Sequence, residues 1–230
     1  MPRKLFELVG RDDNRFSPYC WRTLMALTHK RLDFERVPCR FTDKERIAFS
    51  GQGRVPVLSD GAHTVHDSWT IAEYLEDSFP DRPPLFPGGT PSRALARFVN
   101  AWADTAINPV ILRLVILDLF RHVDPADQDY FRRTREERLG DTLENLHATR
   151  DRHIPAFRAA LRPLETLLKS QAFVSGEAPA YADFIVFGTF QWARLTSPLD
   201  LTAETPAIRT WRERMLDLFD GLGRRARPAQ

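Results

Sequence analysis

The sequence predicts an α/β domain followed by an all-helical domain. In residues 1–80 short strand-like runs alternate with helical stretches, whereas the remainder is patterned as helix almost throughout. Between them lies "PDRPPLFPGGTP", which is too rich in proline and glycine to continue a helix. We therefore expect a first domain at residues 1–80, a linker at 81–91 and a helical domain at 92–230.

The first domain is expected to have the order strand, helix, strand, strand, strand, helix. "KLFELVG" (4–10) is typical of a strand, and "SPYCWRTLMALTHK" (17–30) has apolar residues at helical spacing. "LDFERV" (32–37) is a second strand candidate; after a polar loop, "VPVLSDGAHTVH" (55–66) indicates a hairpin around its Asp-Gly pair. "DSWTIAEYLEDSF" (67–79) is the second helix. This order, with "SPYC" opening the first helix, is the thioredoxin-like arrangement.

The helical domain is expected to contain several amphipathic helices. Their apolar spacing places them at residues 92–122, 126–149, 151–169, 181–195 and 205–219. Pro109 interrupts the first of these and is expected to kink it, because proline lacks the backbone N–H that a helix interior requires.

The composition excludes several classes of protein. Of the 230 residues, 33 basic ones are interleaved with 31 acidic ones, so the net charge of +2 gives no reason to expect a nucleic-acid partner. No apolar run has the length of a membrane span, and the first residues lack a secretory signal, so we expect a cytoplasmic protein without a membrane partner. Two cysteines are too few for a disulfide framework and lack metal-ligand spacing, so no metal is expected.

Four motifs, taken in order along the chain, make the sequence resemble a glutathione S-transferase. They are "SPYC" at the start of the first helix, "RVPVL" before the third strand, "HDSWTIAEYLE" at the second helix, and "YADF" at the start of a helix in the second half. The resemblance implies an N-terminal thioredoxin-like domain that binds glutathione and a helical domain that supplies a hydrophobic substrate site. It also implies a homodimer.

Ser17 is the expected catalytic residue. "SPYC" looks like the redox tetrapeptide of a glutaredoxin with its first cysteine replaced, so the nucleophilic sulfur must come from elsewhere. A serine at the N-cap with Pro18 at the first helical position places a hydroxyl beside the positive end of the helix dipole, which favours an anion by roughly 0.3–1 kcal/mol. If that anion is the thiolate of glutathione, the cosubstrate brings the missing sulfur. The alternative is a serine that only caps the helix.

The resemblance also assigns the residues that hold glutathione. It implies a cis peptide bond at Val55-Pro56 that lets the Val55 backbone pair with the cysteinyl part of glutathione; an ordinary strand-initiating proline is the alternative. A guanidinium grips a carboxylate with two hydrogen bonds, so glycine's carboxylate is expected on an arginine. The full expected set is Arg54, Val55, Pro56, Asp67, Ser68 and, as a weaker candidate than Arg54, Arg40.

Asp67 and Ser68 begin the second predicted helix. Ser68 and the neighbouring N–H groups are suited to the γ-glutamyl carboxylate of glutathione, and Asp67 to its ammonium group. Helix capping alone is the other interpretation of this pair.

Among the transferases, the sequence is most similar to the bacterial β-aryl etherases of lignin breakdown and to their fungal etherase-like relatives. The similarity is carried by "SPYCWRTLMALTHK", "RVPV", "DSWTIAEYLEDSFPDRPPLF" and the closing "LFDGLG". It implies that glutathione thiolate displaces a phenol from the carbon β to a ketone, so a small aromatic electrophile is the expected partner. The alternatives are a general detoxifying glutathione S-transferase, a glutathione-dependent thiol reductase and a non-catalytic ligandin-like binding protein.

The electrophile is expected to contact an apolar wall facing Ser17. Its predicted members come from both domains and are Phe16, Trp21, Phe98, Trp102, Leu112 and Arg113. For Leu112, as for Phe120, a place in the core between helices is an equally good interpretation.

Two further positions carry expectations. Cys20 stands where a glutaredoxin has its second cysteine, and we interpret it as a small buried hydrophobic residue, because Ser17 cannot be its redox partner. At "AYAD" the family usually has Ser or Thr three residues before the aspartate, but here Ala180 occupies that position. Asp183 is therefore expected to cap the Ala180 N–H without a reciprocal hydroxyl.

Overall fold

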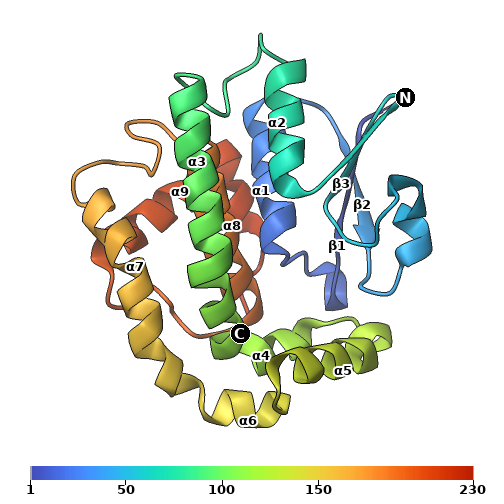
Figure 1. Cartoon of the computed structure of the whole chain (residues 1–230), viewed down its shortest axis with the longest axis vertical. Helices are drawn as coiled ribbons and strands as arrows, with labels where there is room; N and C mark the ends of the chain where they lie inside the picture. The colour runs from blue at the N-terminus through green and yellow to red at the C-terminus, as the bar shows by residue number, and fades with distance from the viewer. Residues whose placement is uncertain (1, 230) are drawn as a thin grey trace.

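The computed structural model describes residues 2–229, which form a sheet-containing part and a helical part (Figure 1). The sheet lies at one side of the molecule, and α1 (Pro18–His29) and α2 (Ser68–Ser78) separate it from the long helices of the second part. A four-stranded sheet with two helices, followed by helices alone, confirms the predicted fold class: a thioredoxin-like domain followed by an all-helical domain.

The strands form a mixed sheet in the order β2-β1-β3-β4. β1 (Lys4–Leu8) runs parallel to β2 (Glu35–Cys39) and antiparallel to β3 (Val57–Asp60), and β4 (His63–His66) forms the far edge. Because β1 and β2 run in the same direction, a crossover must join them, and α1 is that crossover. Gly61 starts the β3–β4 turn at φ 61°, which glycine adopts without steric cost, and the predicted hairpin is confirmed.

Different elements pack against the two faces of the sheet. Leu5 points into the main hydrophobic core, which continues through α1 and α2. On the other face Phe6 and Val57 pack with Ile47, which belongs to a 3-10 helix at Lys44–Ser50. This short helix replaces part of the polar loop expected before the third strand.

The helical part begins with the last two residues of the proline-rich segment, Thr90 and Pro91, which form the first turn of α3. Its helices are α3 (Thr90–Trp102), α4 (Asn108–His122), α5 (Gln128–Leu139), α6 (Leu143–Ala148), α7 (Ile154–Leu168), α8 (Tyr181–Thr196) and α9 (Pro206–Arg225). Two of the predicted helices are each divided in the structure. Gly140, at φ 74°, separates α5 from α6, and a π-helical turn at Ala103–Ile107 separates α3 from α4.

The predicted kink near Pro109 is present and takes the form of a π-helical turn. Residues 90–122 keep helical backbone geometry, the π-helical turn at Ala103–Ile107 falls just before Pro109, and Pro109 itself lies in the first turn of α4. In Figure 1, α3 and α4 consequently run in different directions, and α4 lies with α5 below the sheet and α1.

α8 is buried along almost its whole length and packs against α1. Gly188 permits this close approach, because a Cβ at this position would lie 2.4 Å from the carbonyl oxygen of Pro18. At the start of α8, Asp183 accepts the Ala180 N–H at 3.2 Å, which confirms the predicted one-sided cap. The same carboxylate accepts the Val174 N–H at 2.7 Å, so it also fixes the loop before α8.

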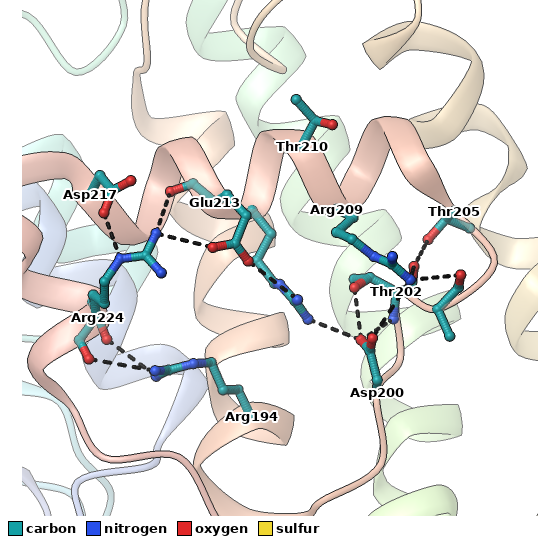
Figure 2. Close-up of polar contacts among 12 residues, drawn as sticks. Arg194, Asp200, Thr202, Thr205, Arg209, Thr210, Glu213, Asp217 and Arg224 are labelled. Carbon is teal, nitrogen blue, oxygen red and sulfur yellow. Dashed lines mark hydrogen bonds and ion pairs between the residues drawn. The ribbon is translucent and has the colours of Figure 1, made fainter.

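The chain turns back within the last part of α9 (Figure 2). The backbone leaves helical geometry over residues 218–221, close to the predicted end of the last helix at residue 219. Arg224, beyond the turn, donates to Asp217 at 2.6 Å, and Arg194 of α8 donates to the carbonyl oxygen of Ala226 at 2.9 Å. Within residues 2–229, no helix combines the length and the apolar character needed to cross a membrane.

Candidate functional site

A cavity of about 1220 Å³ lies between the sheet-containing part and the helical part. One side is formed by the residues around the start of α1, the segment before β3 and the start of α2; α4 and α5 form the other. All the residues predicted to contact glutathione line this cavity, as do Phe16, Leu112 and Arg113 from the predicted apolar wall. The chain therefore brings together residues that are almost 100 positions apart in the sequence.

Ser17 is the N-cap of α1 and lines the cavity. Its Oγ accepts the Cys20 N–H at 3.3 Å, and Pro18 occupies the first turn, as the sequence predicts for this helix start. The side of α1 near Pro18 rests on Gly188 of α8, so helix packing as well as capping positions the hydroxyl. Because Oγ accepts that hydrogen bond with a lone pair, its O–H remains available to donate to an anion in the cavity.

Cys20 is not among the residues that line the cavity. Its side chain is 2% exposed, and its Sγ accepts the Leu8 N–H at 3.4 Å. Burial raises the pKa of the Cys20 thiol to about 12, so the thiol stays protonated at neutral pH. The residue therefore behaves as the small buried hydrophobic group that the sequence indicated.

The segment before β3 carries the peptide bond singled out from the sequence. Val55-Pro56 is cis, and both residues line the cavity. Gln52 holds the neighbouring turn: its side chain accepts the Arg54 N–H at 2.6 Å and donates to the Arg54 carbonyl oxygen at 2.7 Å. The Arg54 backbone is thus held in place, while its exposed guanidinium lies at the cavity.

Arg40 lines the same cavity but already has partners. Its guanidinium donates to Asp43 at 2.9 Å and lies 3.9 Å from Asp124. The hydrogen bond to Asp43 raises the pKa of Arg40, since the pair favours the charged form. Arg54 is therefore the better placed of the two arginines for a carboxylate from outside the protein.

Asp67 and Ser68 form the start of α2, as predicted. Asp67 has φ 71° and accepts the N–H groups of Trp69 and Thr70 at 3.0 and 3.1 Å. Ser68 is 2% exposed, and its carbonyl oxygen accepts the hydroxyl of Tyr181 at 2.6 Å. Burial raises the pKa of Tyr181, so the phenol keeps the proton that it donates. The helical part thus anchors the start of α2.

The predicted apolar wall is only partly present. Trp21 is buried against Phe187, with ring centroids 6.0 Å apart, and its Nε1 donates to a backbone carbonyl at 2.7 Å. Phe98 is 69% exposed on α3, and neither it nor Trp102 lines the cavity. The π-helical turn after Trp102 explains the difference, because it changes the direction of the chain and presents α4, not α3, to Ser17.

α5 supplies cavity residues that the sequence analysis missed. Tyr130, Phe131, Arg135 and Arg138 line the cavity, as does Phe41 from the segment after β2. The spacing of Phe131, Arg135 and Arg138 places them on one face of α5. The available signal was an aromatic pair inside the otherwise charged stretch "QDYFRRTREERL", but only the packing of α5 shows which way that face points.

A buried carboxylate joins the two sides of the cavity. Asp127, just before α5, accepts the N–H groups of Phe41 and Thr42 at 2.6 and 3.2 Å and the Thr42 hydroxyl at 2.5 Å. Phe41 then lies 5.6 Å from Phe131 and 6.4 Å from Phe16, measured between ring centroids. These contacts hold the aromatic part of the cavity together.

Over residues 2–229, no three His, Cys, Asp or Glu side chains are grouped closely enough to hold a metal ion.

Two family models match the chain. Residues 16–78 match the glutathione S-transferase N-terminal domain, and residues 94–219 match the glutathione S-transferase C-terminal domain. The second match alone covers more than half of the chain. The chain therefore belongs to the glutathione S-transferase family.

Curated relatives agree with this assignment. A probable glutathione S-transferase of rice, Oryza sativa subsp. japonica, is 26% identical over 218 residues, which cover 86% of this chain and 80% of the rice protein. Glutathione S-transferase omega-1 of Mus musculus is 25% identical over 204 residues, which cover 86% of this chain and 72% of the mouse protein.

Solved structures of fungal glutathione transferases have the same fold. A glutathione S-transferase of Ceriporiopsis subvermispora, in complex with glutathione, superposes with a TM-score of 0.80 and 23% identity over 98% of this chain and 95% of its own. The glutathione transferase GSTFuA3 of Phanerochaete chrysosporium gives a TM-score of 0.76 and 24% identity, covering 98% of this chain and 94% of its own.

Proposed function

We propose that this glutathione S-transferase cleaves β-aryl ethers of lignin-derived aromatic ketones with glutathione as cosubstrate. In this reaction the glutathione thiolate attacks the carbon next to the ketone carbonyl, which is the β carbon in lignin numbering. A carbon–sulfur bond forms there while the carbon–oxygen bond to the aryl group breaks. The released phenolate takes a proton from water. The carbonyl activates the attacked carbon, so the protein has mainly to position the reactants and stabilise charge.

The observation that carries this proposal is the position of Ser17. Its hydroxyl lies at the N-terminus of α1 and in the cavity, where it is free to donate a hydrogen bond to a thiolate. In the proposed complex Val55 pairs with the cysteinyl backbone, Asp67 and Ser68 hold the γ-glutamyl end, and Arg54 binds the glycine carboxylate, with Arg40 in second place. The thiol in this reaction is that of glutathione. Cys20 is buried and protonated, so it does not act as a redox thiol.

An aromatic electrophile suits the opposite side of the cavity. Phe16, Phe41, Leu112 and Phe131 present aromatic and aliphatic surface there. The volume of about 1220 Å³ exceeds the ~300–1,000 Å³ of a usual small-molecule pocket, so a tripeptide and an aromatic ketone fit side by side. We further propose that residues 1–80 form the glutathione-binding domain and 92–230 the substrate domain, and that the enzyme is a cytoplasmic homodimer.

The test uses reduced glutathione and a ketone that carries a chromogenic phenol, as an aryl ether, on the carbon next to its carbonyl. The enzyme is expected to release the phenol and leave glutathionyl at that carbon, a product that mass spectrometry identifies. The matched alcohol is expected to react far more slowly, because it lacks the carbonyl that activates the attacked carbon. Ready conjugation of simple halides without any ether cleavage would contradict the proposal and favour a general detoxifying transferase.

The pH dependence offers a second check. The rate is expected to rise with pH as the bound thiol ionises and to level off below the pKa of free glutathione, because Ser17 and the helix terminus favour the thiolate. A rate that continues to rise to the pKa of free glutathione would show that α1 does not activate the thiol. Binding of glutathione and aromatic compounds with no turnover would instead indicate a ligandin-like protein.

A further inference from the structure

The cavity contains an excess of positive charge. Its lining includes six basic side chains and three acidic ones: Arg40, Lys44, Arg54, Arg113, Arg135 and Arg138 against Asp43, Asp67 and Asp104. The acidic residues are already engaged. Asp43 pairs with Arg40 at 2.9 Å, Asp104 pairs with the buried Arg22 at 2.7 Å, and Asp67 caps α2.

The three cavity-lining arginines of α4 and α5, Arg113, Arg135 and Arg138, differ from these paired groups. Across residues 2–229, no carboxylate pairs with Arg113, Arg135 or Arg138, although nearby Arg121 and Arg132 do form ion pairs. Arg135 and Arg138 share the α5 face that carries Phe131, and Arg113 comes from α4. The three arginines therefore line, from two helices, the side of the cavity that α4 and α5 form; we call it the electrophile side.

Arg135 is held in a geometry that suits recognition of an anion. Its guanidinium carbon lies 4.7 Å from the ring centroid of Phe131 and 5.3 Å from that of Phe41. One Nη donates to Thr134 Oγ1 at 2.8 Å. A guanidinium stacked on aromatic rings is fixed in orientation and keeps its remaining N–H groups for a coplanar carboxylate. Burial lowers the pKa of Arg135, and the charge of Arg138 lowers it further. A bound anion would favour the charged guanidinium and so offset this shift.

Arg138 also acts on the α1 side of the cavity. Burial and the negative charge of Asp104 raise the pKa of Tyr19, and the positive charges of Arg22 and Arg138 oppose this rise. Arg138 and Tyr19, which is two residues after Ser17, both line the cavity. An acidic group bound by Arg138 would sit within the same cavity as the thiolate.

We infer that the electrophilic substrate is an aromatic molecule bearing a carboxylate, which Arg135 and Arg138, with Arg113 beside them, bind while its ring packs on Phe41 and Phe131. This inference rests on the proposed function for its premise that glutathione occupies the other side of the cavity. It makes the three arginines determinants of specificity, distinct from Arg54, which is proposed for the glycine carboxylate of glutathione.

The experiment measures binding, so that it does not depend on turnover. With the enzyme saturated with S-methylglutathione, which has no free thiol, isothermal titration calorimetry compares biphenyl-4-carboxylate with its neutral carboxamide. The carboxylate is expected to bind about tenfold more tightly, since charge-assisted hydrogen bonds are roughly twice as strong as neutral ones. This preference is expected to fall as sodium chloride is raised.

Substitutions on one helix provide matched controls. Arg138→Gln removes an exposed cavity arginine and is expected to reduce the preference to about twofold or less, whereas Arg133→Gln, outside the cavity lining, is expected to retain it. Arg113→Gln, on α4, is the second variant and does not depend on the folding of α5. Circular dichroism and S-methylglutathione affinity verify that each variant keeps its fold and its glutathione site.

Four results would overturn the inference. They are equal affinity for the two ligands, failure of both to bind, an equal loss of preference in Arg133→Gln, and displacement of S-methylglutathione by the carboxylate. Displacement of S-methylglutathione would mean that the arginines bind glutathione and not the electrophile. Failure of the etherase assay alone leaves these binding measurements intact, so the two proposals fail separately.

Discussion

The two sides of the cavity are built in different ways. The side around Ser17 and Ser68 consists of the starts of α1 and α2 and the segment before β3. There, backbone N–H groups and short side chains are the groups available to bind a ligand. The side formed by α4 and α5 consists of long side chains, such as Phe131 and Arg135, that project from helix faces. The position at which a helix starts is determined by neighbouring residues in the sequence. The direction in which a helix face points is determined by how the helix packs. The first side is therefore suited to one constant cosubstrate and the second to a substrate that varies.

The comparison predicts that the Ser17 side controls turnover. Ser17→Ala removes one donor to the thiolate but leaves the rest of the glutathione contacts, so turnover is expected to fall by roughly 10²-fold while glutathione affinity changes only a few-fold. Steady-state kinetics and calorimetry measure the two quantities separately. Unchanged turnover would show that α1 does not activate the thiol and that Ser17 only caps the helix.

The connection between the two sides is expected to control stability. Asp127→Asn replaces an acceptor of three hydrogen bonds from Phe41 and Thr42 with an amide whose NH₂ faces donors. Unfolding free energy is expected to fall by about 2 kcal/mol, as measured by urea denaturation. Asp129→Asn, at an exposed position on α5, is the control and should have little effect. Equal stability of the two variants would contradict the proposed role of Asp127.

Anchoring of glutathione is expected to separate from its activation. Ser68→Ala should weaken glutathione binding about tenfold, because one hydrogen bond to a carboxylate is lost. Turnover at saturating glutathione should remain close to that of the unmodified enzyme, in contrast to Ser17→Ala. If both variants fail to bind glutathione, the division of the site into an activating and an anchoring part is wrong.

A smaller effect is expected far from the cavity opening, at the start of α8. Ala180→Ser supplies the hydroxyl that would complete the cap whose other half Asp183 already provides. Stability is expected to rise by roughly 0.5–1 kcal/mol without a change in activity. Ala178→Ser, in the exposed loop before it, is the matched control. Chemical denaturation that shows no gain over this control would contradict the expected hydrogen bond.

The smallest effect on turnover is expected at Cys20. Because burial raises the pKa of its thiol to about 12, the thiol remains protonated throughout the working range of the enzyme. Cys20→Ser, whose hydroxyl accepts the Leu8 N–H in place of Sγ, should keep both the rate and its pH profile within about twofold. A large loss of activity, with Ser17→Ala tolerated, would favour a glutathione-dependent thiol reductase.

The side of the cavity around Ser17 and Ser68, proposed to bind glutathione, was largely predictable from the sequence because its signals are local. Pro18 after Ser17 and the Asp67-Ser68 pair mark helix starts, and these helices begin there. Asp183 likewise accepts the Ala180 N–H that its spacing indicated. Each of these depends on hydrogen bonds between residues no more than three positions apart, so the pattern of neighbours is sufficient to predict them.

The electrophile side was less predictable because its signals are not local. Phe98 and Trp102 have the apolar character expected of a pocket wall, but the π-helical turn at Ala103–Ile107 redirects the chain after α3. Trp21 has helical spacing suited either to the core or to a pocket, and contact with Phe187 of α8 places it in the core.

The sequence was sufficient to predict the order of strands and helices in the sheet-containing part, the capped helix starts and the family of the chain, because these follow from neighbouring residues and short motifs. The place of α5 against the sheet-containing part depends on Asp127 reaching Phe41, 86 positions away. The same packing gathers Arg113, Arg135 and Arg138 around one cavity. Contacts over such separations arise only when whole helices pack, so the character of the electrophile site emerges from the folded chain.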